Sequence, residues 1–531
     1  MESHPQLFAG MGSHHRKVTT TSREAQKYFD QGLTFAFSFN HDEAIRSFTE
    51  AARLDPQLAA AWWGVALCNG PHINNPAMDE EHSKAAWEAL QKAQGLASTA
   101  TPEERALIEA LGARYADPSK GKVPMEPPER APLDKTYADA MAKVHAQFPR
   151  DNDIATLYAE SLMDLRPWDL WDIDGSPRPE TPAIVSTLEG VLAADRNHPG
   201  ANHLYIHAVE ASPHPERGVP AAQRLKTLVP SAGHMVHMPA HIWARVGKWD
   251  EAGAANRQAI AADAAYRKLS PNQGFYHIYM AHNHQFLAFG CMMQGRSDEA
   301  IASARAMRER IPDAFIEHAA PLIDGVLIIG LEVKMRFGKW EEILKEPMPG
   351  DNLPISLAMW HGARAIALAN MGRMSGAMAE RDAFAAAAKA VPEDRMVLNN
   401  SAPKVLTVAS HVIDGELAFK QGSVDEAVTH LKEAVKVEDT LKYDEPPDWM
   451  IPARHTLGAV LLKAGRTREA EEVYRQDLKR WPENGWSLFG LAQALRKQGS
   501  SEAPGVEGRF KRAWADADIS IGSSCMCVKG E

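Results

Sequence analysis

Two stretches near opposite ends of the chain share one pattern of small and aromatic residues. The first stretch contains Gly32, Phe35, Ala44, Phe48, Ala51 and Pro56. The second contains Leu457, Gly458, Leu461, Ala470, Tyr474 and Pro482. Small residues let two helices approach closely, an aromatic side chain fills the remaining gap, and proline ends the second helix. The pattern therefore predicts a repeated unit of ~34 residues that consists of two packed helices.

An acidic start to the second helix recurs along the chain. Asp-Glu-Ala stands at residues 42–44, 250–252, 298–300 and 425–427, and acidic side chains are favourable at a helix N-terminus. No stretch has the sustained alternation of polar and apolar residues that is typical of a strand. These observations predict an all-α fold, a tetratricopeptide-like solenoid in which helix–turn–helix pairs stack into a right-handed superhelix.

We divide the 531 residues into four parts. These are an N-terminal strap (1–21), a histidine-rich solenoid that carries the site (22–313), C-terminal repeats (314–515) and a tail (516–531). Asp117–Pro132 and Trp168–Pro182 are expected to be loops. The tail contains Cys525 and Cys527; we expect it to fray, with a soft-metal or redox role as the alternative.

Charge and composition exclude several classes of function. The formal net charge is −11, and nucleic-acid binding needs a basic face, so no nucleic-acid partner is expected. The longest apolar run, near Leu322–Val333, is interrupted by Asp324 and Glu332 and is too short to span a membrane. Four cysteines are too few for a disulfide framework, so we expect a cytoplasmic protein.

The 22 histidines are concentrated in the middle of the chain. His203, His207 and Glu210 have the spacing H-x3-H-x2-E, which places them on one face of a helix. His234, His237 and His241 form a second set on the next first-of-pair helix, and His282 and His284 lie on a third. Such helices are neighbours in a solenoid, so their imidazoles can converge on a metal ion. We expect His203, His207, His237, His241 and His282 to be the metal ligands.

Carboxylates and further polar groups accompany these histidines. Glu160 and Glu210 are the candidates for acid–base catalysis. The residues that could contact substrate or support the ligands are His41, His72, Asp164, Trp168, His234, Asn283 and His284. The alternative is a structural hydrogen-bond network that runs through the groove.

Imidazole ligands suit copper, iron and zinc alike. We favour an enzyme in which copper or iron oxidises a small organic substrate in the concave groove. The alternatives are a zinc hydrolase and a non-catalytic scaffold that binds a peptide in the same groove. Peptide-binding grooves of this class use Lys, Arg and Asn to hold a peptide terminus, whereas His, Trp and Glu stand here.

Five stretches of the chain resemble a group of bacterial tetratricopeptide-repeat proteins of largely unassigned function. They are SHHRKVTT with YFDQGLTFAFSFNHDEA, AWWGVALCNGPHINNP, LRPWDLW, NHLYIHAVEASPHPERG and GHMVHMPAHIWARVGKWDEA. The resemblance implies functional roles for His41, His203, His207, Glu210, His234, His237, His241, His282 and Asn283. At residues 281–287 the chain departs from the group's P-H-N-x-H-F-L pattern, because His284 is displaced by one position, about 100° around a helix.

Overall fold

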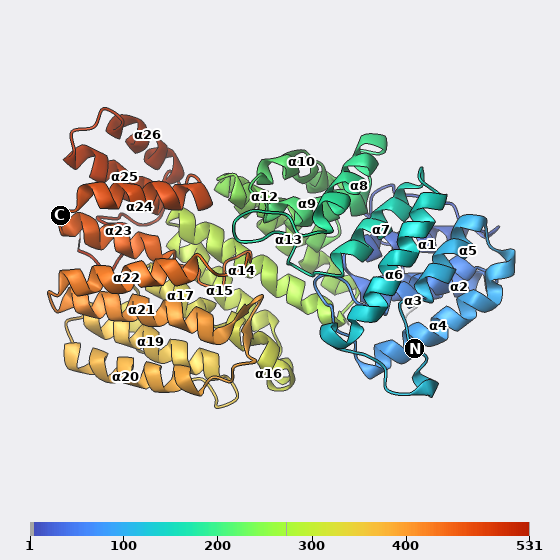
Figure 1. The fold of residues 1–531 in the computed structure, drawn as a ribbon, viewed down its shortest axis with the longest axis horizontal. Helices are drawn as coiled ribbons and strands as arrows, with labels where there is room; N and C mark the ends of the chain where they lie inside the picture. The colour runs from blue at the N-terminus through green and yellow to red at the C-terminus, as the bar shows by residue number, and fades with distance from the viewer. Residues whose placement is uncertain (1–4, 272, 530–531) are drawn as a thin grey trace. The chain divides into compact units, whose positions relative to one another are not determined.

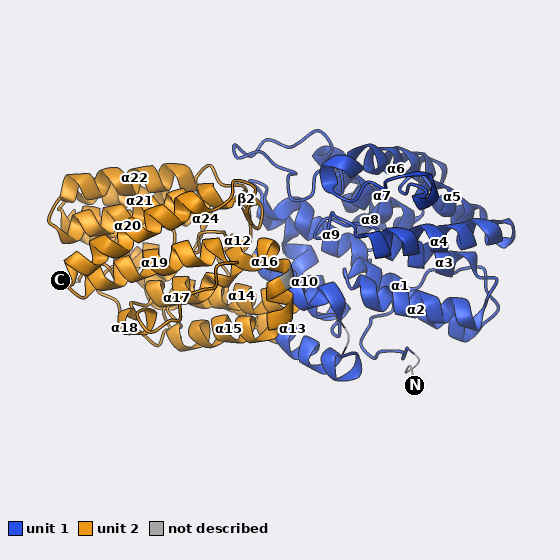
Figure 2. Ribbon diagram, turned by 90° about the horizontal axis from the view of Figure 1, so that it is seen from below, with its two compact units in different colours: residues 1–242, 258–279 blue, residues 243–257, 280–531 orange. Residues whose placement is uncertain are grey.

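The protein is built almost entirely of α-helices, as a computed structural model that describes residues 5–271 and 273–529 shows (Figure 1). Successive helices pair and stack, which confirms the all-α, tetratricopeptide-like solenoid predicted from the sequence. The described residues divide into two compact units (Figure 2). Unit 1 comprises residues 1–242 and 258–279, and unit 2 comprises residues 243–257 and 280–531.

Unit 1 holds the first eleven helices and the beginnings or ends of three more. Its helices are α1 (Arg23–Phe37), α2 (His41–Leu54), α3 (Ala59–Cys68), α4 (Glu80–Leu96), α5 (Pro102–Leu111), α6 (Pro127–Gln147), α7 (Asn152–Met163), α8 (Thr181–Ala194), α9 (Pro199–Glu210), α10 (Val219–Leu228) and α11 (Gly233–His237). The helices with residues in both units are α12 (Pro239–Arg245), α13 (Trp249–Leu269) and α14 (His277–Gln294).

Unit 2 continues the helical pairs and contains one short hairpin. Its helices are α15 (Ser297–Arg310), α16 (Asp313–Leu327), α17 (Ile329–Arg336), α18 (Trp340–Ile343), α19 (Pro354–Asn370), α20 (Met374–Ala390), α21 (Ala402–Lys420), α22 (Val424–Glu438), α23 (Ala453–Lys463), α24 (Thr467–Arg480), α25 (Gly485–Lys497) and α26 (Ala503–Ala513). The antiparallel strands β1 (Met396–Val397) and β2 (Asn400–Ser401) join α20 to α21.

The small and aromatic residues of the repeat pattern pack as the sequence predicted. Phe48 of α2 is fully buried between Gly32 of α1 and Gly64 of α3. A Cβ atom at either glycine would lie 2.7 Å from the Phe48 ring, so a larger residue would force the helices apart. Tyr474 of α24 occupies the same position between Gly458 of α23 and Gly490 of α25.

Eight turns between paired helices share one backbone geometry. In seven of them a glycine with positive φ precedes a residue whose N–H donates to the carbonyl five positions back. These glycines are Gly247, Gly295, Gly338, Gly372, Gly422, Gly465 and Gly499. The turn between α1 and α2 makes the same hydrogen bond, from Asn40 to Phe35, but its positive-φ residue is Phe39, with φ 54°. The α1–α2 turn therefore has a phenylalanine at the positive-φ position that glycine occupies in the other seven turns.

Two expectations about irregular segments are wrong in detail. The predicted loop Asp117–Pro132 ends early, because α6 begins at Pro127 with prolines in its first turn, where a missing N–H costs nothing. The C-terminal tail does not fray, because Ser523, Ser524, Cys525, Cys527 and Val528 are buried. The Trp168–Pro182 segment is a loop up to α8, as expected.

The division of the chain into a strap, a histidine-rich solenoid, C-terminal repeats and a tail stays a prediction. Within the described residues, no helix has both the length and the apolar character that crossing a bilayer requires.

Candidate functional site

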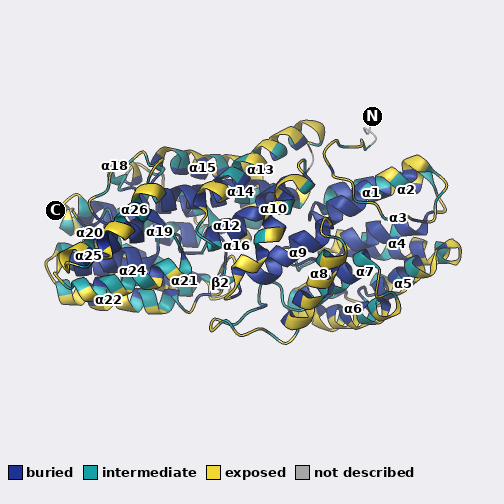
Figure 3. Ribbon diagram, turned by 90° about the horizontal axis from the view of Figure 1, so that it is seen from above, coloured by how far each residue is buried: buried dark blue, intermediate teal, exposed yellow. Residues whose placement is uncertain are grey.

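Helix α9 presents the first part of the histidine cluster, which we define as His203, His207, His234, His237 and His241 with Glu210. His198 caps α9 by accepting a hydrogen bond from the N–H of Ala201, and Pro199 fits the first helical position. All twelve residues of α9 are buried (Figure 3). The predicted face of His203, His207 and Glu210 is therefore enclosed in the protein, and it does not line an open groove.

The reason for this burial is the turn of the first repeat. Phe37 lies against α9, where a Cβ on Gly200 would overlap its ring. The Phe39 ring lies 4.5 Å from the ring of His203 and 4.4 Å from that of His72, with which it stacks. Residues of the α1–α2 turn, distant from α9 in the sequence, thus cover its imidazoles.

Helices α11 and α12 supply the second part of the cluster. A single helix was predicted here, but Pro239 begins a new helix after His237, because proline cannot donate the hydrogen bond that would continue α11. His234 and His237 lie on α11 and His241 lies on α12; all three are buried.

The hydrogen bonds of His203 fix which nitrogen carries its proton. Nδ1 lies 2.7 Å from the carbonyl oxygen of Phe37. A carbonyl only accepts, so Nδ1 donates and Nε2 keeps its lone pair. That Nε2 lies 3.1 Å from Nε2 of His234. Two nitrogens on one tetrahedral ion at ~2.05 Å are about 3.3 Å apart, so the observed spacing is close to that of two ligands.

His207 has the same arrangement with a carboxylate as acceptor. Its Nδ1 lies 2.9 Å from Oε1 of Glu210, while its Nε2 is buried and has no hydrogen-bond partner among the described residues. One ligand nitrogen from each of His203, His207 and His234 lies within 4.8 Å of the other two. Metal-binding histidines characteristically donate their second N–H to a carbonyl or carboxylate in this way.

Glu210 holds two imidazoles at once. Its second oxygen, Oε2, lies 2.5 Å from Nδ1 of His241, and Nε2 of His241 lies 2.7 Å from Nε2 of His237. Burial alone would raise the pKa of Glu210, but His241 and His207 outweigh it and hold this pKa well below its ordinary value. The ionised carboxylate therefore orients both rings.

Burial favours the neutral form of three imidazoles of the cluster, those of His203, His207 and His234. It lowers the pKa of His207, and it holds the pKa of His203 and of His234 well below 6.5, with neighbouring imidazoles adding to the effect. Neutral imidazole is the form that binds a metal ion, so these rings are ready to act as ligands at neutral pH.

Aromatic side chains enclose the cluster. Trp168 packs edge-on against His207 with ring centres 5.2 Å apart, and its indole N–H donates to Asn74. Tyr279 lies 4.4 Å from His234. Trp168 has a positive φ of 60°, as Phe39 does of 54°. Non-glycine residues in this conformation cost ~1–3 kcal/mol, and such strain is concentrated at functional sites.

The predicted carboxylates at the C-terminal end of α7, Glu160 and the C-cap Asp164, form a separate group with Arg114. Glu160 lines a cavity of about 10 Å³ together with His41 and Arg114. Arg114 donates to Asp164 at 2.5 Å. Burial and the charge of Asp164 raise the pKa of Glu160 to about 8. His72 is buried and its ring contacts that of His41, so His72 lies between the histidine cluster and the group formed by Glu160, Asp164 and Arg114.

His282, Asn283 and His284 lie on the part of α14 that belongs to unit 2. Nδ1 of His282 lies 3.2 Å from Oε1 of Gln285, and Asn283 and His284 are buried. Their predicted roles, like those of Glu160 and Asp164, stay predictions.

Sequence reasoning missed two parts of the site. One is the carbonyl of Phe37, which no side-chain pattern can reveal. The other is Phe39, whose signal was available: it stands where seven other turns have glycine.

A second histidine pair in unit 1 has a structural explanation. His14 and His198 both contact Oδ1 of Asp153, at 2.9 and 3.0 Å, and Arg16 contacts Oδ2 at 3.0 Å. Three side chains thus contact this carboxylate, which connects the N-terminal strap to α7 and α9.

Comparison with known proteins supports the fold and leaves the function open. The family model described as a tetratricopeptide repeat matches residues 455–503. No curated protein is similar to the chain in sequence. The chain thus contains a tetratricopeptide-repeat segment at residues 455–503.

Two similar solved structures cover most of the chain at low identity. A human IFIT1 dimer with m7Gppp-AAAA has 13% identity and a TM-score of 0.34, over 94% of this chain and 92% of that one. The APC/C hetero-tetramer Cut9–Hcn1 has 13% identity and a TM-score of 0.33, over 92% and 76%. Likenesses at this level carry no argument about function.

Proposed function

We propose that unit 1 binds a transition-metal ion through His203, His207 and His234, and that the protein is a metal-dependent oxidoreductase that uses copper or iron on a small organic substrate. The observation that carries the proposal is the proton arrangement of two adjacent rings. His203 and His207 each donate through Nδ1 to a fixed acceptor, which leaves both Nε2 lone pairs beside His234.

The buried, unpartnered Nε2 of His207 supports a bound ion. Leaving a buried polar nitrogen without a partner costs ~1–3 kcal/mol, and coordination would remove that cost. Three imidazoles also leave a coordination position open, as catalytic metal sites do. The sequence alone places His234 among the residues that contact substrate or support the ligands. Here we propose that it is itself a ligand.

The arrangement of Glu210 favours redox over hydrolytic chemistry. A hydrolase needs a general base that is free to take a proton from water. Both oxygens of Glu210 are directed at imidazoles, and its pKa is lowered, so it is suited to orient His207 and His241 and not to accept a proton. Copper or iron, when bound, would supply one-electron chemistry. Phe39 and Trp168 would exclude bulk water from the ligands.

The burial of α9 also argues against a peptide-binding role for these histidines. A peptide in a concave groove contacts exposed side chains, whereas His203, His207 and His234 have at most 6% of their surface exposed.

Spectroscopy and turnover of tag-free protein test the proposed reaction class. We expect protein loaded with copper or iron to show an imidazole-ligated spectrum and to consume oxygen or another oxidant with a small organic substrate. We expect His207→Ala to lose both properties. Hydrolytic turnover with zinc alone would favour the zinc hydrolase, and protein that binds no metal would favour the scaffold.

A further inference from the structure

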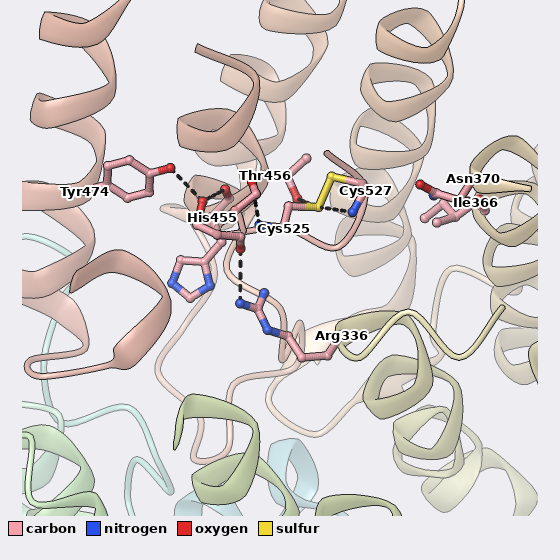
Figure 4. Close-up of a disulfide and its surroundings, with 10 residues drawn as sticks. Arg336, Ile366, Asn370, His455, Thr456, Tyr474, Cys525 and Cys527 are labelled. Atoms are coloured by element: carbon pink, nitrogen blue, oxygen red, sulfur yellow. Dashed lines mark hydrogen bonds between the residues drawn. A yellow bond between two sulfur atoms is a disulfide. The ribbon is translucent and has the colours of Figure 1, made fainter. Parts of the chain in front are cut away.

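The C-terminal tail of unit 2 is fixed in the interior of that unit. Ser524 accepts a hydrogen bond from Arg336 at its carbonyl, and its hydroxyl donates to the carbonyl of His455 and contacts the hydroxyl of Tyr474 (Figure 4). Residues of α17, α23 and α24 therefore hold the residue that precedes Cys525.

Two sulfur atoms and one carboxylate meet at this point. Cys525 and Cys527 are joined by a disulfide, with Cα atoms 5.1 Å apart. Their sulfur atoms and one oxygen of Glu416, on α21, all lie within 4.8 Å of one another, and all three residues are buried. Thr456 donates to the sulfur of Cys525 at 3.6 Å.

Glu416 has a buried oxygen whose role within unit 2 is unexplained. Its Oε2 has no hydrogen-bond partner among the described residues, and only 6% of the residue is exposed. Burial raises the pKa of Glu416 to about 7, which Lys420 offsets only in part. A buried acceptor of this kind calls for a cation or a donor.

The surroundings have space and charge for one ion. A cavity of about 20 Å³ is lined by Glu416, Cys525, Met526, Thr456 and Arg336, together with apolar side chains. That is enough for about one water molecule or ion. Two thiolates and a carboxylate carry three negative charges, which a divalent ion and Arg336 would balance.

We propose that the reduced form of this tail binds a zinc-type divalent ion through the sulfurs of Cys525 and Cys527 and the carboxylate of Glu416. A small thiol or phosphine reductant first opens the disulfide and is itself oxidised, which gives two thiols. The ion then replaces the two thiol protons, which pass to water, and two metal–sulfur bonds form. This site is independent of the histidine cluster, and the disulfide and the metal-bound dithiol exclude each other.

The test is a titration of full-length, reduced protein with Co²⁺ in the absence of oxygen, followed by competition with Zn²⁺. Thiolate ligands give Co²⁺ an intense sulfur-to-metal absorption band that imidazole ligands do not give. We expect this band to reach one ion per chain and to disappear on addition of Zn²⁺. The oxidised protein should not show it.

Variants identify the ligands. Cys527→Ser should weaken Co²⁺ binding at this site by roughly 100-fold or more, and Glu416→Gln by about tenfold or more. Cys291→Ser, which changes a buried free cysteine of unit 2, and Cys68→Ser in unit 1 serve as controls and should leave the band unchanged.

A second readout does not depend on the stability of these variants. In wild-type reduced protein, Zn²⁺ should slow alkylation of Cys525 and Cys527 by iodoacetamide, measured by mass spectrometry. The absence of a thiolate band together with unchanged alkylation rates would overturn the proposal and leave the pair as a structural disulfide. A band that persists in Cys527→Ser would also overturn it.

Discussion

At the scale of single residues, the site depends on where two protons lie. The Phe37 carbonyl and the Glu210 carboxylate each take an N–H from an imidazole, and each thereby frees a lone pair on the far side of that ring. Only the bond between His207 and Glu210 could be predicted from the sequence, because these residues are three positions apart on one helix. The first joins α1 to α9 and has no local signature.

The orienting role of Glu210 can be tested by Glu210→Gln. The amide oxygen can accept from one imidazole, but the amide N–H₂ then faces the N–H of the other. We expect metal affinity to fall about 10–100-fold with helicity retained. Isothermal titration with the metal measures the affinity, and Glu216→Gln, at an exposed carboxylate of the same unit, is the control. Unchanged affinity in Glu210→Gln would contradict the role.

The lowered pKa of His72 predicts a pH effect on the metal-free protein. Burial holds this pKa well below 6.5, so between pH 6.5 and the folded-state pKa the unfolded chain binds more protons than the folded one. His72 therefore reduces the free energy of unfolding as pH falls below 6.5, by up to ~1.4 kcal/mol per pH unit.

His72→Asn isolates this contribution, because its amide oxygen can accept the hydrogen bond that Nδ1 of His72 receives from Asn74. We expect the variant to lose less stability than the wild type between pH 6.5 and 5, in urea unfolding at each pH. Glu160, whose pKa is raised, acts in the opposite direction, and its contribution cancels in the comparison. Equal pH slopes would refute the assignment.

At the scale of elements, the turn between α1 and α2 differs from its counterparts. Seven counterparts have glycine at the positive-φ position, where a side chain is unfavourable. Phe39 adopts this unfavourable backbone conformation, and its ring packs against those of His72 and His203. The repeats themselves were predictable, since each helix pair carries its own small and aromatic residues. The break at Pro239 could have been predicted from the proline, but His234, His237 and His241 have the three- and four-residue spacing of one continuous helix.

Substitutions at Phe39 separate strain from packing. Phe39→Gly and Phe39→Ala both lose the buried ring, at a cost of about 3–5 kcal/mol in the alanine case. Phe39→Gly also removes the backbone strain, so it should be more stable than Phe39→Ala by ~1 kcal/mol. Chemical unfolding of both variants gives the difference. Equal stability would show that the turn tolerates a Cβ without strain.

At the scale of the whole molecule, the sequence predicted the fold class better than the site. The solenoid could be predicted from both ends of the chain, because each repeat has the same small and aromatic residues at its helix–helix contact. The cluster and the residues that enclose it come from the α1–α2 turn, the Trp168 loop, α9, α11 and α12. Such long-range convergence is not encoded in any one spacing. The burial of α9 and of the C-terminal tail could not be predicted from the sequence either, because each depends on segments distant in the sequence.

Metal binding should stabilise the unit that holds the cluster. An ion present at 100 times its Kd adds ~2.7 kcal/mol to the free energy of unfolding of the state that binds it. In scanning calorimetry, we expect metal to raise the transition that includes unit 1, and a chelator to reverse this shift. His207→Ala should remove the shift, and the same shift in His207→Ala would place the ion elsewhere.

The most direct test of the central claim is the metal content per chain of protein purified without a histidine tag, with His203→Ala, His207→Ala and His234→Ala alongside. His214→Ala, at an imidazole with 70% of its side chain exposed, is the control. We predict one tightly held copper or iron ion in the wild type and in the control, and a strong loss in each of the three variants with helicity intact. A wild-type protein without metal, or variants that keep full metal content, would contradict the account.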